Sequence, residues 1–185
     1  MKKIGLFFGS FNPIHIGHLI IANYIVENTE LNQIWFVVSP QNPLKNKATL
    51  LNDYQRLTLV KIAIEDNPKF KACDIEFKMP TPSYTYLTLQ KLRTKHPKYA
   101  FALIMGMDNL ATLNKWKNYK EITENHKIFV YPRNHDEVEI TKFNENIILT
   151  QAPKIEISSS FIRQSIKNNK DVKYLLSPEV YNYVK

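Results

Sequence analysis

The sequence predicts an α/β fold with a parallel sheet covered by helices on both faces. Two observations carry this prediction. Apolar runs of strand length alternate with helical stretches along the whole 185-residue chain, and no repeat, low-complexity tract or linker interrupts them. Alternating strands and helices form parallel sheets, and right-handed crossovers make a doubly wound sheet the default. Residues 1–185 are therefore expected to form one domain of this Rossmann-like type.

Short apolar runs predict the strands, because a parallel strand covered on both faces is apolar throughout. The predicted strands are Lys3–Phe8, Gln33–Ser39, Lys71–Phe77, Tyr99–Met105, Lys127–Tyr131 and Asn146–Thr150. Asn52-Asp53 and Ser83 precede two of the predicted helices as candidate N-caps. The predicted helices are Ile16–Asn28, Asn52–Asp66, Tyr84–Lys95, Leu110–Leu113, Tyr119–Glu124, Ser159–Lys167 and Pro178–Val184.

Three irregular, polar stretches interrupt this order, at Pro40–Leu51, Lys78–Ser83 and Arg133–Glu145. Each follows a predicted strand, so all three are expected to gather at one edge of the sheet. Ligands bind at that edge in such folds, and polar, proline-stiffened loops suit a substrate mouth, although ordinary connectors look similar.

The net charge of +8 and the pI near 9.4 indicate either a nucleic-acid surface or a cleft for small anions. The lysines are scattered, which is typical of solvated helix faces, and basic and aromatic residues do not interleave as in single-strand-binding sheets. No nucleic-acid partner is therefore expected.

The sequence also argues against a membrane location and export. No apolar run approaches the length of a bilayer span. The apolar run Ile4–Phe8 follows two lysines as in a signal peptide, but it is too short, and Asn12 and Pro13 come soon after it. The single cysteine, Cys73, cannot form an internal disulfide, which fits a reducing, cytoplasmic location.

The segment Gly9–His18 is the most informative part of the chain. It leads from the first predicted strand into the first predicted helix, and it holds two of the four glycines and the pair His15 and His18. Backbone N–H groups at a helix start point at an anion, the helix dipole favours it, and glycine lets it approach closely. The segment therefore predicts a phosphate-binding site.

A second helix start of this kind lies near the carboxyl end, at Ile157–Arg163. One serine before an apolar run is explained as an N-cap, but three in a row, with Arg163 one turn into the helix, exceed that need. Hydroxyls, free N–H groups and a guanidinium again suit phosphate. Two such starts suggest that a polyphosphate, most commonly a nucleoside triphosphate, is held between them.

Other site motifs do not occur. The sequence contains no Walker-type loop, no Gly-x-Gly-x-x-Gly, no Gly-x-Ser-x-Gly and no His-Glu-x-x-His. This argues against kinase-type, ordinary dehydrogenase and hydrolase functions. Without a cysteine or carboxylate close by, His15 and His18 are not expected to bind a metal ion.

These motifs resemble a known family. Gly9–His18 is similar to the His-x-Gly-His motif of the nucleotidyltransferase superfamily, and Ile157–Arg163 to its serine-rich, arginine-bearing partner. The segments Pro82–Thr85 and Ile104–Leu110, followed by Trp116, resemble the bacterial nicotinate-nucleotide adenylyltransferases in particular.

The resemblance implies transfer of the adenylyl group of ATP to nicotinate mononucleotide, with Mg²⁺ accompanying ATP. It implies catalytic roles for His15, His18 and Arg163. It implies ATP contacts at Gly9, Ser10, Phe11, Gly17, Gly106, Asp108, Ser159, Ser160 and Ile162, with Asp108 suited to the ribose hydroxyls. It implies acceptor contacts at Asn12, Lys45, Thr85 and Trp116, with Trp116 stacked on the pyridine ring.

Alternatives remain open from the sequence alone. Trp116 also fits a core position, Lys45 a solvated loop and Asp108 a buried N-cap. Leu44 stands where the family usually has histidine. The acceptor could instead be nicotinamide mononucleotide or phosphopantetheine, and a module that binds ATP without turnover would keep the phosphate sites but not need Thr85 and Trp116.

Overall fold

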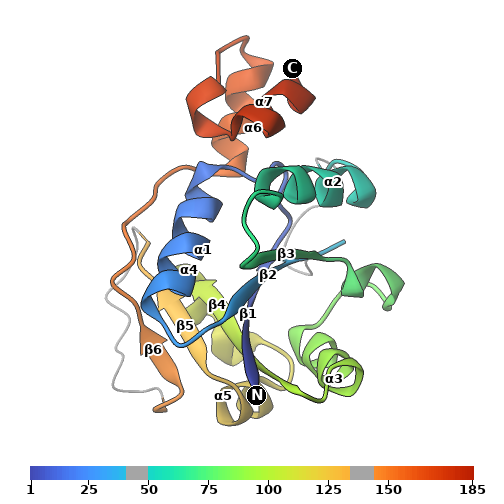
Figure 1. Cartoon of the computed structure of the whole chain (residues 1–185), viewed down its shortest axis with the longest axis vertical. Coiled ribbons are helices and arrows are strands. Elements are labelled where there is room, and N and C mark those ends of the chain that lie inside the picture. The colour runs from blue at the N-terminus through green and yellow to red at the C-terminus, as the bar shows by residue number, and fades with distance from the viewer. Residues whose placement is uncertain (41–49, 134–143) are drawn as a thin grey trace.

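The computed structural model describes residues 1–40, 50–133 and 144–185, and the described part forms a six-stranded parallel sheet (Figure 1). The strand order is β3-β2-β1-β4-β5-β6. The strands are β1 Lys2–Gly9, β2 Gln33–Val38, β3 Phe70–Cys73, β4 Tyr99–Gly106, β5 Ile128–Tyr131 and β6 Ile147–Leu149. All five neighbouring pairs are parallel, which confirms the predicted doubly wound sheet.

Helices cover both faces of this sheet. The α-helices are α1 Ile16–Asn28, α2 Asp53–Ile64, α3 Thr85–Lys95, α4 Met107–Leu110, α5 Tyr119–Asn125, α6 Ser159–Lys167 and α7 Pro178–Val184. Short 3-10 helices lie at η2 Ile75–Lys78, η3 Leu113–Lys115 and η5 Lys173–Leu175. No helix among the described residues is long and apolar enough to cross a membrane.

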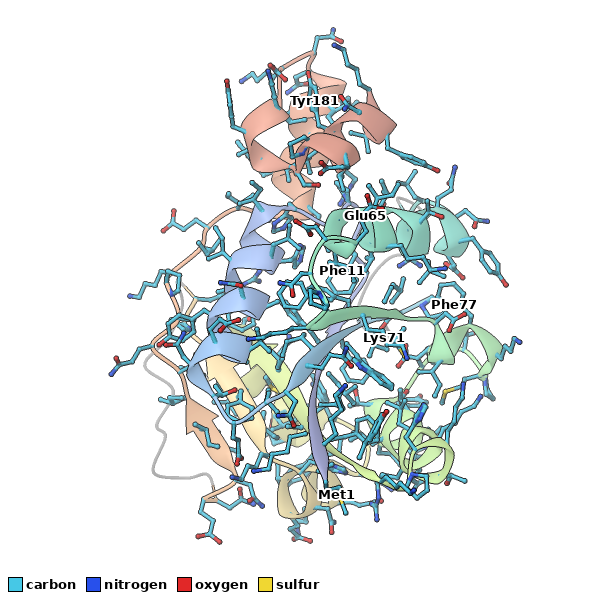
Figure 2. The ribbon with its side chains drawn as sticks, in the orientation of Figure 1. Met1, Phe11, Glu65, Lys71, Phe77 and Tyr181 are labelled. Carbon is cyan, nitrogen blue, oxygen red and sulfur yellow. The ribbon has the colours of Figure 1, made fainter. Side chains whose placement is uncertain are left out.

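Alternate residues of the strands supply two separate cores. On β1, Phe7 belongs to the core formed with α1, α2, α6 and α7, whereas Leu6 belongs to the core formed with α3, α4 and α5. The side chains fill the space on both sides of the sheet, and Phe11, just beyond β1, lies in the interior (Figure 2). Burial on both faces explains why the strands are continuous apolar runs.

The strand order places a ligand crevice at a defined point. The chain moves from β1 to β2 on one side and returns to β4 on the other, so the order reverses between β1 and β4. Ligands of doubly wound sheets bind outside the carboxyl ends of the strands at this switch point. The segments that leave β1 after Gly9 and β4 after Gly106 therefore lie beside one crevice.

Two predicted elements differ in the structure. The predicted strand Lys71–Phe77 ends at Cys73, the last residue paired with β2 (opposite Val37), because the chain then turns into η2, where the Phe77 N–H donates to the Asp74 carbonyl at 2.9 Å. The predicted helix Leu110–Leu113 is displaced, because Gly106 caps α4 directly at the end of β4 and η3 follows separately.

Of the two predicted N-caps, one is confirmed and the other is wrong. Asn52 caps α2, its side chain accepting a hydrogen bond from the Tyr54 N–H at 2.9 Å. Ser83 was expected to cap the third helix, but Tyr84 occupies the cap position of α3 and makes no side-chain cap bond. The buried Ser83 hydroxyl lies near the Glu76 carboxyl, but it has no hydrogen-bond partner among the described residues.

Candidate active site

The segment after β1 folds tightly around Phe11. Phe11 has a φ of 46°, a left-handed conformation that is uncommon for a bulky residue, and its ring is buried. A Cβ on Gly9 would lie 2.7 Å from the ring of Phe11, so this glycine is required by the ring packed against it. The predicted role of Gly9 in admitting an anion stays a prediction.

His15 and His18 lie against each other at the start of α1. Their ring centroids are 3.7 Å apart, and the backbone N–H of His15 donates to Nδ1 of His18 at 3.2 Å. A Cβ on Gly17 would lie 2.6 Å from Ile155 and 3.0 Å from Nδ1 of His15, so glycine lets the His15 ring fold over the helix start. The ring of Phe11 borders His18 edge-on at 5.1 Å.

The two histidines present donors rather than bases. Burial, helped by the nearby charge of Arg133, lowers the pKa of His15 to about 4, so His15 is neutral at pH 7. In His18, Nδ1 accepts the backbone hydrogen bond, which places the ring proton on Nε2. Each of the two rings therefore carries an N–H group, the kind of donor that suits an anion.

The start of α6 meets this segment directly. Ser158 caps the helix by accepting from the Phe161 N–H at 3.1 Å. The Ser159 hydroxyl donates to the Pro13 carbonyl at 2.8 Å, and the Arg163 guanidinium donates to the Asn12 carbonyl at 2.8 Å. The structure thus brings together the two helix starts that the sequence predicted as phosphate sites.

Ser160 and Ile162, two further residues of α6 predicted to contact ATP, differ in their surroundings. Arg163 also donates to the Ser160 hydroxyl at 3.2 Å, which places Ser160 beside the guanidinium. The Ile162 side chain is fully buried and its backbone N–H bonds to the Ser158 carbonyl at 3.1 Å, so both of these Ile162 groups are already engaged. The predicted ATP contact of Ile162 stays a prediction.

Gly106 and Asp108 lie across the crevice at the end of β4. A Cβ on Gly106 would lie 2.3 Å from Oδ1 of Asp108 and 3.2 Å from the Arg133 side chain. Asp108 is not the N-cap of α4, a position held by Gly106; its carboxylate is partly exposed and pairs with Arg133 at 3.3 Å. Arg133 was not predicted as a site residue, but it faces this crevice and lies close enough to influence His15.

The predicted acceptor residues do not all lie together. Asn12 is buried in the segment after β1, where its carbonyl accepts from Arg163 and its Oδ1 from the Leu51 N–H at 3.2 Å, whereas Thr85 and Trp116 lie on two other elements. Thr85 is the first residue of α3, and Trp116 directly follows η3 and packs partly against the core. Lys117, next to Trp116, places its ammonium 4.9 Å above the ring of Tyr84, next to Thr85. The two segments therefore lie side by side. Lys45 and Leu44 fall outside the described residues.

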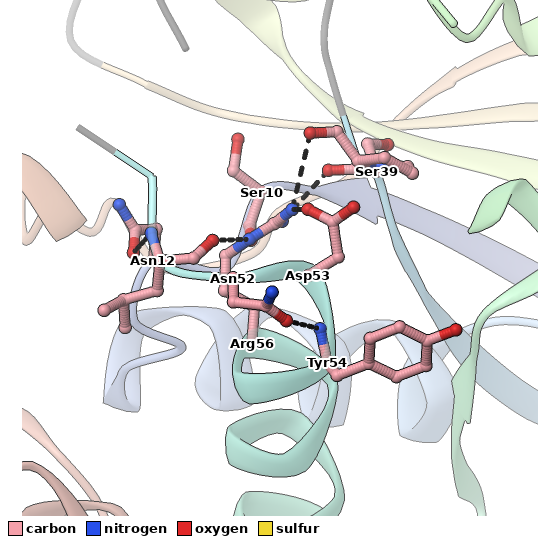
Figure 3. A network of polar contacts seen from close by, with 9 residues as sticks. Ser10, Asn12, Ser39, Asn52, Asp53, Tyr54 and Arg56 are labelled. Carbon is pink, nitrogen blue, oxygen red and sulfur yellow. Dashed lines mark hydrogen bonds and ion pairs between the residues drawn. The ribbon is translucent and has the colours of Figure 1, made fainter. Parts of the chain in front are cut away.

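Arg56 is a residue near the site that the sequence prediction missed (Figure 3). It is fully buried and donates to the carbonyls of Ser10 at 2.5 Å, Ser39 at 2.9 Å and Leu51 at 3.1 Å, and it pairs with Asp53 at 2.6 Å. Arg56 thereby joins the ends of β1 and β2 to the start of α2. The available signal was a charged residue four positions before the core residue Val60, on the apolar face of the helix.

The chain is similar to known adenylyltransferases. It matches the model of the cytidylyltransferase-like family over residues 6–165. A protein of Flavobacterium psychrophilum named probable nicotinate-nucleotide adenylyltransferase is 58% identical over 184 residues, 98% of this chain and 95% of that protein. A protein of the same name from Bacteroides thetaiotaomicron is 46% identical over 183 residues, 99% of this chain and 91% of that protein.

Solved structures share the fold. The nicotinic acid mononucleotide adenylyltransferase of Plasmodium falciparum, solved in complex with NaAD, gives a TM-score of 0.84 at 23% identity, covering 100% of this chain and 95% of that one. A putative nicotinate-nucleotide adenylyltransferase from Vibrio parahaemolyticus gives 0.76 at 22% identity, covering 100% and 99%. These likenesses extend over the whole sheet and its helices.

Proposed function

The chain belongs to the cytidylyltransferase-like family and, within it, to the nicotinate-nucleotide adenylyltransferases, and on that premise we propose that it makes nicotinate adenine dinucleotide. ATP and nicotinate mononucleotide are the substrates, and pyrophosphate is the second product. The single observation that carries the proposal is the meeting of the α1 and α6 starts at the switch point of the sheet.

The reaction needs positioning and charge neutralisation more than it needs a base. A phosphate oxygen of the acceptor forms a bond to the α-phosphorus of ATP while the bond from that phosphorus to the bridging oxygen breaks. The attacking oxygen is already anionic, so no proton has to be removed from it. Catalysis then comes from donors placed where charge develops on pyrophosphate.

His15, His18 and Arg163 supply those donors in this proposal. The rings of His15 and His18 each donate one N–H to the triphosphate. Arg163 uses one N–H for Asn12 and one for Ser160, so three of the roughly five N–H donors of a guanidinium remain for the β and γ phosphates. The hydroxyls of Ser159 and Ser160 complete that end.

The remaining predicted contacts divide between the two substrates. The Asp108 carboxylate, beside Gly106, suits the ribose hydroxyls of ATP, and it would exchange its pairing with Arg133 for them. Asn12, Lys45, Thr85 and Trp116 are assigned to the acceptor, with Trp116 stacking on the pyridine ring.

Mg²⁺ is assigned to ATP rather than to a protein site. Among residues 1–40, 50–133 and 144–185, no group of three His, Cys, Asp or Glu side chains could hold a metal ion. Mg²⁺ is commonly held by substrate phosphates and water, an arrangement that leaves the donors of His18 and Arg163 for the phosphate oxygens. Bound in this way, it would neutralise charge on the departing pyrophosphate.

A cytoplasmic location completes the proposal. Cys73 is buried, and burial raises the pKa of its thiol, so the thiol is unreactive. A chain whose single cysteine cannot form an internal disulfide is suited to a reducing compartment.

The experiment is pyrophosphate release from ATP and Mg²⁺ with three acceptors in separate reactions: nicotinate mononucleotide, nicotinamide mononucleotide and phosphopantetheine. The expected result is fast release with the first acceptor. His18→Ala, purified in parallel, controls for contaminating activity. Fast release with phosphopantetheine alone would overturn the acceptor assignment, and ATP binding without release with any acceptor would indicate a non-catalytic module.

A further inference from the structure

A group of polar residues next to the site takes no part in the mechanism above. Its members are the buried Arg56, Glu76 and Thr88 and the half-buried Ser39, called here the buried polar chain. They come from α2, the end of β2, η2 and α3, so four elements meet through it. Arg56, Glu76 and Thr88 are 0%, 1% and 0% exposed, so three polar side chains are buried in one interior region.

One end of this chain holds the ATP side of the crevice. Arg56 donates from the same nitrogen to the carbonyls of Ser10 at 2.5 Å and Ser39 at 2.9 Å (Figure 3). Ser10 lies in the segment that carries Phe11 and leads to His15 and His18. The position of the ATP-side segment relative to β2 is therefore fixed through Arg56.

The other end holds the acceptor side. The Thr88 hydroxyl lies 2.7 Å from Oε1 of Glu76, to which it donates, and 3.4 Å from the carbonyl of Tyr84, the N-cap of α3. Burial raises the pKa of Glu76, while the nearby hydroxyls of Thr88, Ser39 and Ser83 lower it. Of these three hydroxyls, only that of Thr88 hydrogen-bonds to the carboxyl, and among the described residues Oε2 of Glu76 has no hydrogen-bond partner. Ser39 thus links both ends, its carbonyl contacting Arg56 and its hydroxyl lying near Glu76.

Fold stability alone does not account for this arrangement. Burying charged groups has a high desolvation cost, and well-packed apolar residues of similar volume often stabilise a fold as much or more. The buried polar chain connects the two segments whose separation matters for in-line transfer. In such reactions a misplacement of about 1 Å can reduce the rate by roughly 10²-fold.

We propose that the buried polar chain sets the spacing between the ATP-side segment at Ser10 and the acceptor-side segment at Tyr84, so that its members are positioning residues for adenylyl transfer. This inference rests on the proposed function. It places the effect of these residues on kcat, because each substrate can still bind to its own side when the spacing is wrong.

The first test is Thr88→Val, which keeps the shape of the side chain and removes the hydroxyl between Glu76 and Tyr84. Its matched control is Thr94→Val, on an exposed part of the same helix, where the hydroxyl donates to the Gln90 carbonyl. The readouts are kcat at saturating ATP and nicotinate mononucleotide, the Kd for ATP by calorimetry, and the Tm. We expect Thr88→Val to lower kcat about tenfold relative to Thr94→Val, with the Kd for ATP within about twofold of wild type.

The second test is Ser39→Ala, which removes the hydroxyl near Glu76 and leaves the carbonyl that binds Arg56. It decides the matter if Thr88→Val does not fold, and we again expect a lower kcat with an unchanged Kd for ATP. A folded Ser39→Ala or Thr88→Val with the kcat of Thr94→Val would overturn the proposal, as would a lower Tm without a change in kcat. An inactive wild-type protein would contradict the proposed function itself.

Discussion

The two sides of the crevice, proposed above for ATP and for the acceptor and called here the ATP side and the acceptor side, are built differently. On the ATP side, hydrogen bonds from Ser159 to Pro13 and from Arg163 to Asn12 join segments that are 146 and 151 residues apart in sequence. On the acceptor side, Thr85 begins α3 and Trp116 directly follows the short helix η3, and Lys117 connects the two segments by placing its ammonium over the rings of Tyr84 and Tyr86.

This difference reflects what each side has to recognise. The triphosphate of ATP is an invariant group. A site fixed by buried groups such as His15 can therefore be preorganised to bind it. The acceptor side has to distinguish one small molecule from related ones. Changes on the ATP side should therefore reduce rate and ATP binding, and changes on the acceptor side should alter selectivity.

Among changes on the ATP side, His18→Ala is expected to have the largest effect on the rate. We expect kcat to fall by roughly 10² to 10³-fold, the usual cost of losing one donor to charge developing in the transition state. Pyrophosphate release measures the loss, and circular dichroism checks that the variant is folded. A folded variant with a near-normal rate would show that His18 has no part in the mechanism.

Arg163→Ala tests the contribution of α6. Hydrogen bonds to charged groups contribute about 1.5 to 3 kcal/mol, so kcat/KM for ATP should fall about 10- to 100-fold. Arg163→Lys should recover only part of this, because an ammonium cannot form the bidentate phosphate contact. If the ATP titrations of mutant and wild type coincide, Ile157–Arg163 serves only to cap a helix.

Acid should reveal how tightly the ATP side is packed around His15. Its pKa is about 4 in the folded protein and near 6.5 when unfolded, so the unfolded state binds more protons between these pH values. Stability is complete above pH 6.5 and falls as the pH decreases toward 4. We expect urea titrations to show His15→Gln losing about 2 kcal/mol less than wild type between pH 7.5 and 5. Parallel losses in the two proteins would contradict the assignment.

The acceptor side is tested by comparing two acceptors, the carboxylate nicotinate mononucleotide and the amide nicotinamide mononucleotide. A site made of donors, such as the Thr85 hydroxyl and N–H groups at the start of α3, leaves the amide NH₂ facing another donor, at a cost of about 1 to 3 kcal/mol. Nicotinate mononucleotide should therefore be preferred over nicotinamide mononucleotide at least about tenfold in kcat/KM. Thr85→Val should narrow this ratio and Thr94→Val should not. Equal efficiencies in wild type would refute the selectivity while leaving adenylyl transfer intact.

Much of the fold could be predicted because its strands are apolar on both faces. The bounds of α1, α6 and α7 are as predicted, and the doubly wound sheet followed from the alternation of elements. The strand predicted through Phe77 failed because pairing with β2 ends near Cys73, a tertiary limit that the apolar pattern does not record.

The candidate site also contains residues that the sequence predicts and residues that depend on tertiary contacts. Gly9–His18 and Ile157–Arg163 carry local signals, namely a glycine turn and serines before a helix. Arg56 shows only a charge on the apolar face of its helix, which does not reveal its role, because its partner Ser10 is 46 residues away and the contact is to a backbone carbonyl. Arg133 was missed for the same reason, since its relation to Asp108 and His15 depends on the order of β4 and β5 in the sheet.

Calorimetric titration of each substrate into two variants tests most directly whether separate sets of residues bind ATP and the acceptor. ATP and nicotinate mononucleotide would be titrated separately into wild type, Arg163→Ala and Trp116→Ala. Arg163→Ala is predicted to weaken ATP binding about tenfold or more and to leave nicotinate mononucleotide within about twofold, and Trp116→Ala to do the reverse. If both variants weaken both substrates equally, or if Arg163→Ala leaves ATP binding unchanged, α1 and α6 do not form a separate triphosphate site.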